Sequence, residues 1–269
     1  QINPNRVDIS EPEEGCTDSD IGYYLELDNY ATSDEDNHYI SMDYGNATVT
    51  DINGETRQFV PAEYSIKNDL YSQNQIDFID KYLNNLFKIV YEACENGKYY
   101  KFDENYDLVD SDVTTAEEAV SNVMDIDSVR DMYILYEIVH DYDCGEGSFY
   151  MCVDFSKDSK CPKLKFTSPW DFNWAYNDST EKYYAGAFTD KNFVAKNGDR
   201  SNPWFIILCK QDWFMDAVKE KWTEMSREKL LQGCIKTERE YLKEYDADLR
   251  KGEEWGPDSA EDLFNWIEN

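Results

Sequence analysis

Residues 1–70 contain short apolar runs that are separated by Asp, Asn and Gly. The runs lie at Ile21–Leu27, Tyr39–Tyr44 and Gln58–Ile66, and they are rich in aromatic and β-branched residues. Runs of this kind between turn-forming residues are typical of strands. The pattern therefore predicts a β-rich segment over residues 1–70.

From Ser72 onward the apolar residues are spaced three and four apart. The residues that share this spacing are Ile76, Ile79, Leu83, Leu86, Phe87 and Val90. Such spacing places them on one face of a helix, and Ser is a favoured residue at the N-cap of a helix. Residues 71–269 are accordingly predicted to be mainly helical.

Two shorter helices are predicted in the middle of the chain. Thr114 and Thr115 lie three residues before Glu117 and Glu118, which is the spacing of a capping box. A further helix begins near Asp127, because apolar residues recur at helical spacing after it.

The C-terminal part also has helical patterns. Asp212 is a predicted cap for Trp213–Met225, Ser226 begins a charged helix to about Lys251, and Ser259–Ile267 forms the last one. Strands come first and helices follow, with one hairpin between helices, so the fold class is predicted to be α+β.

That hairpin is formed by two strand-like runs, Ser148–Phe155 and Lys163–Thr167. The link between them, SKDSKCP, is polar and ends in Pro, as in the turn of an antiparallel hairpin. Asp143 lies just before the first run and Asp171 just after the second. Since an antiparallel hairpin returns the chain to its starting point, we expect these two carboxylates at the same end of it.

Charge narrows the classes of function. The 269 residues include 57 acidic and 26 basic ones, so the formal net charge is −31. This balance argues against binding to nucleic acid phosphates and to anionic membrane surfaces, both of which need clustered Lys and Arg. No apolar run reaches the roughly 18–20 residues that cross a bilayer. The length fits one large domain, and we treat 1–269 as a single domain.

Neither the cysteines nor the acidic run at residues 34–37 have the spacing of a known metal site. The seven Cys form no C-x-x-C pair and only two His are present, so a structural zinc site is disfavoured. We expect mostly free, partly buried thiols rather than a disulfide framework. The acidic run at residues 34–37 lacks the spacing of a calcium loop and is predicted to be a solvated turn.

Two converging carboxylates permit two kinds of chemistry. They can bind Mg²⁺ together, or one can act as a base while the other holds the metal, as in protein kinases. Asp143 and Asp171 can equally be ordinary loop carboxylates in a chain with 57 acidic residues. Their spacing alone leaves both interpretations open.

The string SPWDFNWAYN, preceded by GSFYM and Asp143, resembles the spore coat protein H (CotH) kinase family. That family carries the pattern SFYMYKD … GPxWDFDxAFGN. The strings NRVDI and GYYLELD near the N-terminus are also similar to it, as is Trp204–Leu208 with the Trp-containing helix that follows. The resemblance covers the chain from Gln1 to about Trp222.

The resemblance implies an atypical protein kinase fold, mainly the helical C-lobe, that uses Mg²⁺ and ATP to phosphorylate Ser or Thr of a protein. Asp143 would be the catalytic Asp and Asp171 the metal-binding Asp, with Asp171 also contacting the nucleotide. Asn173 stands where the family often has a second Asp, so this metal ligand would lack a charge. Ser148 and Glu146 are the nearest candidates for further cofactor contacts. The resemblance also implies a secreted, cell-surface or spore-associated protein.

The sequence lacks recognisable phosphate-binding elements. We find no G-x-G-x-x-G and no strand Lys with an obvious helix Glu partner. In the family these elements come earlier, so we expect a C-terminal lobe of a longer protein, which binds ATP weakly and is inactive by itself. His140 is expected to be a packed helix-end residue. Basic residues that either offset the acidic field or serve solubility are Lys163, Lys165, Lys191, Lys196 and Arg200.

An alternative function belongs to a different class. The chain contains 21 Tyr and 7 Trp, and aromatic side chains stack on sugars and dominate interfaces. A non-catalytic extracellular interaction module or carbohydrate-binding module with a kinase-derived fold is therefore a second hypothesis. A calcium-dependent module is a third. The sequence leaves the acceptor substrate and the oligomeric state open.

Overall fold

The computed structural model describes residues 7–33, 38–50, 56–139, 141–157, 159, 162–172, 175 and 202–249. Its contacts divide the chain into two compact units, Gln1–Met215 and Asp216–Asn269. The described elements mix helices and sheet, which confirms the predicted α+β class. The kinase-like character of the fold stays a prediction.

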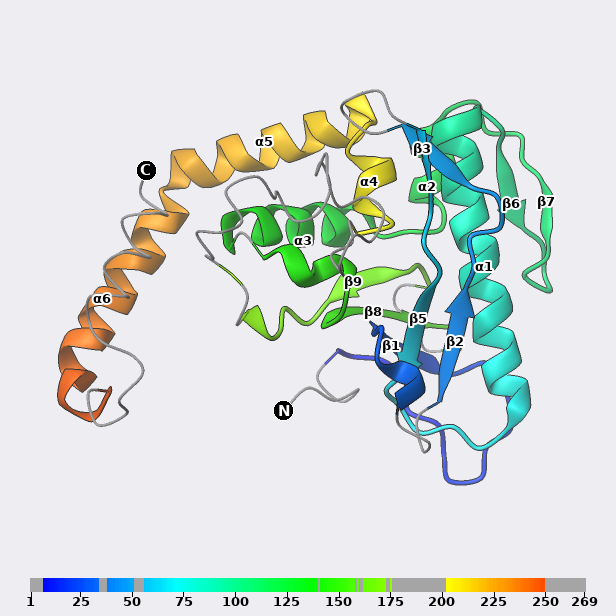
Figure 1. The fold of residues 1–269 in the computed structure, drawn as a ribbon, viewed down its shortest axis with the longest axis horizontal. Coiled ribbons are helices and arrows are strands. Elements are labelled where there is room, and N and C mark those ends of the chain that lie inside the picture. The colour runs from blue at the N-terminus through cyan, green and yellow to red at the C-terminus, as the bar shows by residue number, and fades with distance from the viewer. Residues whose placement is uncertain are drawn as a thin grey trace. The chain divides into compact units, whose positions relative to one another are not determined.

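A five-stranded antiparallel sheet organises the first unit, with strand order β2-β5-β1-β8-β9 (Figure 1). Its strands are β1 Gly22–Leu27, β2 Tyr39–Met42, β5 Ala62–Ile66, β8 Phe149–Asp154 and β9 Lys165–Thr167. Two small antiparallel pairs lie apart from it. They are β3 Thr48–Thr50 with β4 Thr56–Gln58, and β6 Tyr100–Phe102 with β7 Leu108–Asp110.

The described helices follow the predicted pattern closely, and the predicted helix Ser259–Ile267 lies outside the described residues. Their bounds are α1 Gln73–Asn96, α2 Ala116–Ser121, α3 Ile126–Val139, α4 Phe205–Leu208, α5 Asp212–Glu228 and α6 Leu230–Leu249. Two short 3₁₀ turns are η2 Ala31–Ser33 and η3 Tyr142–Gly145. The predicted caps of the first two helices are confirmed. Gln75 Oε1 accepts from the Ser72 amide at 3.2 Å, and Thr115 Oγ1 accepts from the Glu118 amide at 3.2 Å.

The two faces of the sheet are covered differently. On one face, the Tyr23 ring of β1 stacks on Phe78 of α1, and Phe149 of β8 contacts the rings of Tyr136 in α3 and Phe205 in α4. On the other face, the rings of Tyr24 and Tyr150 stack at 5.4 Å, and Val7 and Ile9 pack against them. The central strand β1 is therefore buried on both faces.

Three boundaries differ from the sequence prediction. The run Gln58–Ile66 forms two separate strands, β4 and β5, because Pro61 has no amide hydrogen for a sheet. Ser226 lies inside α5, and the break before α6 falls at Lys229, whose φ is 54°. The β6–β7 hairpin has no counterpart in the prediction, because strands of three residues carry too little pattern.

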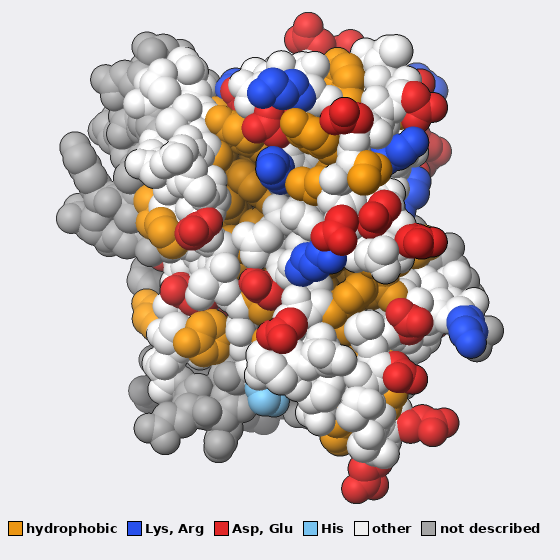
Figure 2. Space-filling model, turned by 90° about the vertical axis from the view of Figure 1, so that its right-hand side faces the viewer, with side chains coloured by type: hydrophobic (Ala, Val, Ile, Leu, Met, Phe, Trp, Pro, Cys, Tyr) orange, Lys and Arg blue, Asp and Glu red, His pale blue; other side chains and the backbone are white. Residues whose placement is uncertain are grey.

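The cysteines and the helices fit their predictions where the structure describes them. Six of the seven Cys are described and free, three of them buried; Cys161 lies outside the described residues. Within the described ranges, no helix combines the length and apolar character needed to cross a membrane. Figure 2 views the face that carries α1 and the β6–β7 hairpin, where acidic side chains are widespread and basic ones lie between them.

Candidate active site

The hairpin of β8 and β9 forms as the sequence predicts, and its register shows which segments meet at its end. Tyr150 pairs with Thr167, and on the other side of β8 Phe149 pairs with Leu27. The segments 28–30, 146–148 and 168–171 therefore leave three adjacent strands at one end of the sheet. This confirms that the chain before the hairpin and the chain after it come together.

Backbone strain is concentrated at this end. Ser148, Ser168 and Asp171 have φ values of 53°, 53° and 59°, in the left-handed region that non-glycine residues rarely adopt. They are three of the seven described non-glycine residues with positive φ. Strained backbone persists only where the surroundings enforce it, and it clusters at functional sites.

Asp171 is exposed, while the residue after it anchors the segment. The ring of Phe172 contacts Tyr136 of α3 at 5.5 Å, and Tyr136 in turn contacts Phe149 of β8. No described residue donates a hydrogen bond to the Asp171 carboxylate or forms an ion pair with it. The side chain of Trp170 is 44% exposed beside it. The backbone beside Asp171 is thus anchored, and the carboxylate remains available to a ligand.

Asp143 lies in η3, directly after α3, so its backbone is at the same end of the sheet. Its side chain lies outside the described part of the structure. The turn itself is firmly placed, because Asn202 Nδ2 donates to the carbonyl of Cys144 at 2.8 Å and the Cys144 side chain is buried. Tyr136 Oη also donates to the carbonyl of Ser148 at 3.5 Å.

Asn202 is a positioning residue that the sequence analysis missed. It is completely buried, and its Oδ1 accepts from the amides of Trp204 and Phe205 at the start of α4, at 3.0 and 3.2 Å. Its side chain therefore joins η3 to α4. Asn just before an apolar run is the pattern of a helix cap, which was the signal that could have identified it.

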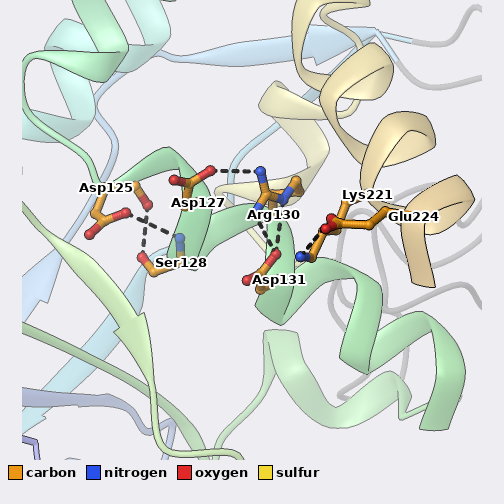
Figure 3. A network of polar contacts seen from close by, with 7 residues as sticks. All are labelled: Asp125, Asp127, Ser128, Arg130, Asp131, Lys221 and Glu224. Atoms are coloured by element: carbon orange, nitrogen blue, oxygen red, sulfur yellow. Dashed lines mark hydrogen bonds and ion pairs between the residues drawn. The ribbon is translucent and has the colours of Figure 1, made fainter. Parts of the chain in front are cut away.

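Helix α3 is also connected to β9 through Ser128, and the close-up shows Ser128 with the polar residues around the first turns of the helix (Figure 3). Ser128 Oγ donates to the carbonyl of Asp125 at 2.7 Å and accepts from the amide of Phe166 at 3.2 Å. Arg130 forms ion pairs with Asp127 and Asp131 at 2.6 and 2.8 Å. The Ser128–Phe166 bond joins the helix that leads to η3 to the strand that leads to Asp171, whereas the Arg130 ion pairs lie within α3.

Glu146 contributes to structure at this end. Its Oε2 accepts from Asn29 Nδ2 at 2.9 Å, and its carbonyl accepts from the Asn29 amide at 3.1 Å. These bonds connect the loop before β8 to the end of β1. Ser148, the other candidate for a cofactor contact, is half-buried in its left-handed conformation.

Charges on the nearby sheet face are balanced. Lys67, just after β5, pairs with Glu26 at 2.5 Å and lies 3.7 Å from Asp28. Asp28 also accepts from Ser65 Oγ at 2.8 Å. With the Glu26 carboxylate beside it, burial raises the pKa of the Tyr150 phenol above its ordinary value. The charge of Lys67 is therefore neutralised by these carboxylates, and Lys67 adds little attraction for a phosphate group.

Lys163 and Lys165 are not at the candidate site, contrary to one interpretation of the sequence. They precede Phe166 in β9, whereas Asp171 follows the other end of that strand. Lys163 Nζ donates to the carbonyl of Ser121 at 2.6 Å, which gives it a structural contact. Other sequence candidates lie outside the described residues: Asn173, His140, Lys191, Lys196, Arg200 and the acidic turn 34–37.

A half-buried acid, Glu137, lies two residues before the end of α3. Glu137 has one carboxylate oxygen, Oε1, that is buried without a hydrogen-bond partner among the described residues. Desolvation raises the pKa of this carboxyl to about 8, and a hydrogen bond from the neighbouring Tyr133 lowers it in part. Burial also raises the pKa of the adjacent Cys209 thiol well above its ordinary value. Both groups are therefore predominantly uncharged at neutral pH.

The oxygen atoms available at this end of the sheet are of the type that a hydrated Mg²⁺ ion binds. Mg²⁺ prefers oxygen ligands and keeps several waters, so one or two carboxylates can hold it. Asp171 offers an exposed carboxylate that has no partner among the described residues. Within the described residues, however, no three acidic, His or Cys side chains converge in the arrangement of a complete metal site.

No family model, curated protein or solved structure matches the chain. The resemblance to the CotH kinase family therefore stays a prediction, and the function is argued from the site.

Proposed function

We propose that the chain provides the catalytic carboxylates of a Mg²⁺-dependent protein kinase, which transfers phosphate from ATP to Ser or Thr of a protein. The observation that supports this most is the place of Asp171. It is exposed and strained after the hairpin, and the turn that contains Asp143 precedes the hairpin, so both segments belong to the same end of the sheet. Two carboxylate-bearing segments at one sheet end are what such chemistry requires.

In this proposal each acidic residue has a separate role. Asp171 would hold Mg²⁺, which when bound neutralises charge on the phosphates. Asp143 would accept a hydrogen bond from the acceptor hydroxyl and take its proton as the oxygen bonds to the γ-phosphorus. The bond from the γ-phosphorus to the β–γ bridging oxygen breaks, and ADP leaves. Asn202, Tyr136 and Phe172 would keep the two segments in register.

The decisive experiment replaces the metal-binding acid. The variant Asp171→Ala in the full-length protein should lower transfer of labelled phosphate from ATP to the protein and to Ser/Thr peptides by about 10³-fold, because the metal loses its main protein ligand. Asp69→Ala is the matched control, since Asp69 is also an exposed loop carboxylate. Undiminished transfer by Asp171→Ala would refute the assignment.

For the 269-residue chain alone, we expect weak nucleotide binding. Lys67 is neutralised by its neighbours and the chain carries a net charge of −31, so little in it attracts a polyphosphate. Calorimetric titration with Mg-ATP should give a Kd of roughly 1 mM or weaker. Micromolar affinity would contradict this expectation.

A further inference from the structure

A cavity lies between α1 and the turn that joins β2 to β3, away from the candidate active site. Its volume is about 530 Å³, within the range of small-molecule sites. Two segments of the first unit form its walls, residues 43–47 and residues 84–96. Figure 2 views this side of the molecule and shows a hollow in which hydrophobic side chains are exposed among charged ones.

Two adjacent Asn residues of α1, Asn84 and Asn85, line this space. Asn84 Nδ2 donates to the carbonyl and Oδ1 of Asp80 at 2.9 and 3.0 Å, and Asn85 Nδ2 donates to the carbonyl of Tyr106 at 3.0 Å. Both amide groups are therefore fixed by their nitrogen atoms. Their oxygen atoms receive no hydrogen bond within the described part of the chain, although both residues line the cavity.

An aromatic cluster gives the cavity a rigid floor. The ring of Phe87 lies 4.6 Å from that of Tyr44 and stacks on that of Tyr91 at 5.9 Å. Tyr91 Oη donates to the carbonyl of Thr48 and accepts from its amide. Tyr44 has a φ of 54°, a strained conformation at the cavity wall. The floor is thus held in place before any ligand binds.

The charged groups of the rim favour a neutral ligand. Asp43 accepts from the Gly45 amide, and Glu92 accepts from Asn96 and lies 3.7 Å from Lys98, so both carboxylates are partly satisfied. Lys88 is the cationic side chain of the lining, with its Nζ 6.0 Å from the centre of the Tyr100 ring. Carboxylate, amide and ammonium groups together can both accept and donate hydrogen bonds.

We infer that this cavity binds a neutral saccharide of one or two sugar units. Sugar hydroxyls both donate and accept, so they can donate to the oxygens of Asn84 and Asn85 and accept from Lys88. The C–H faces of a sugar ring are apolar and suit the aromatic floor. The site is independent of phosphoryl transfer and uses none of its residues.

The test is saturation-transfer NMR of the full chain with glucose, galactose, mannose, N-acetylglucosamine, lactose, cellobiose and chitobiose. At least one sugar should bind with a Kd below about 10 mM, and Asn84→Ala should weaken that binding at least tenfold, about 1.4 kcal/mol. Asn84→Ala should fold, because Ala is the better helix former. Lys88→Ala should also weaken the binding of the same sugar.

Asn74→Ala is the matched control, because Asn74 is an exposed residue of the same helix outside the cavity. Its sugar affinity should equal that of the unmodified chain. The inference is overturned if no sugar of the panel saturates below about 10 mM. It is equally overturned if Asn84→Ala binds the sugar as well as the control does.

Discussion

The two ends of the central sheet treat their carboxylates in opposite ways. At the end where β8 finishes, Asp154 is buried and accepts from the amide and hydroxyl of Ser10, both at 3.0 Å, and from the amide of Ser156 at 2.9 Å. At the end where β8 begins, Asp171 is exposed and has no described partner. One carboxylate stabilises the fold, and the other is available for chemistry.

Further hydrogen bonds stabilise the end of the sheet that carries Asp154. Asn68 accepts from the Tyr24 amide at 2.9 Å and donates to the carbonyl of Gly22 at 3.0 Å. A Cβ at Gly22 would lie 2.7 Å from the Cβ of Ile9, so the N-terminal segment packs directly on this strand. At the end that carries Asp171, three non-glycine residues, Ser148, Ser168 and Asp171, have left-handed backbones. The end with Asp154 is therefore the more extensively bonded one, and the end with Asp171 is the one proposed for chemistry.

The largest stability effect should come from Asp154→Ala. Three donors would lose their acceptor in a buried place, so we expect the free energy of unfolding to fall by about 3 kcal/mol. Asp171→Ala should change it by less than about 0.5 kcal/mol in the same urea titration. Equal losses in the two variants would mean that the two ends do not differ as described.

Asn202→Ala should have the next largest effect, about 2 kcal/mol, because it leaves the Cys144 carbonyl and two α4 amides without their buried partner. Phosphate transfer should fall as well, through displacement of η3. Asn202→Asp keeps the acceptor for α4 but removes the donor to Cys144, so it separates the two contributions. A variant with full activity and full stability would refute a positioning role.

Glu137 adds a third kind of carboxyl group, one that is half-buried and incompletely paired. Its pKa is about 8 in the folded chain and near 4.5 in the unfolded chain, so the folded state binds the extra proton between these values. Its contribution to stability is therefore full below pH 4.5 and is lost as the pH rises to 8.

Glu137→Gln should remove this dependence. Relative to the unmodified chain, the variant should gain on the order of 2 kcal/mol between pH 5 and pH 8, measured by urea unfolding at each pH. Glu117→Gln is the control, because Glu117 is an exposed residue of α2. A difference that is the same at every pH would show that Glu137 is charged in the folded state.

Sequence patterns predicted what depends on local chemistry. The period of α1, the Thr115 cap and the β8–β9 hairpin were all visible as spacing, and the hairpin alone was enough to bring the segment of Asp171 back to that of Asp143. The parts that the sequence did not reveal depend on distant partners. Asn202 reaches a carbonyl 58 residues earlier in the chain, and no local pattern encodes that contact.

Burial was the other property that escaped prediction. Glu137 lies in a helix whose apolar face was recognised, but its desolvation depends on α4, which follows much later in the chain. Lys163 and Lys165 were near the site in sequence, yet Lys165 is the first residue of β9 and Lys163 precedes it, whereas Asp171 follows the last residue of β9. Closeness in sequence to the candidate site therefore did not by itself place a residue at that site in the structure.

The pairing of β1 has a consequence for how the chain folds. Leu27 pairs with Phe149, about 120 residues later, whereas Leu25 pairs with Ile66 of β5, about 40 residues later. During synthesis β1 can acquire its β5 neighbour early, but its other edge stays unpaired until β8 has left the ribosome. An open edge of this kind is a template for another chain. Folding of this sheet is therefore expected to be slow, and the half-built sheet is the state most exposed to aggregation.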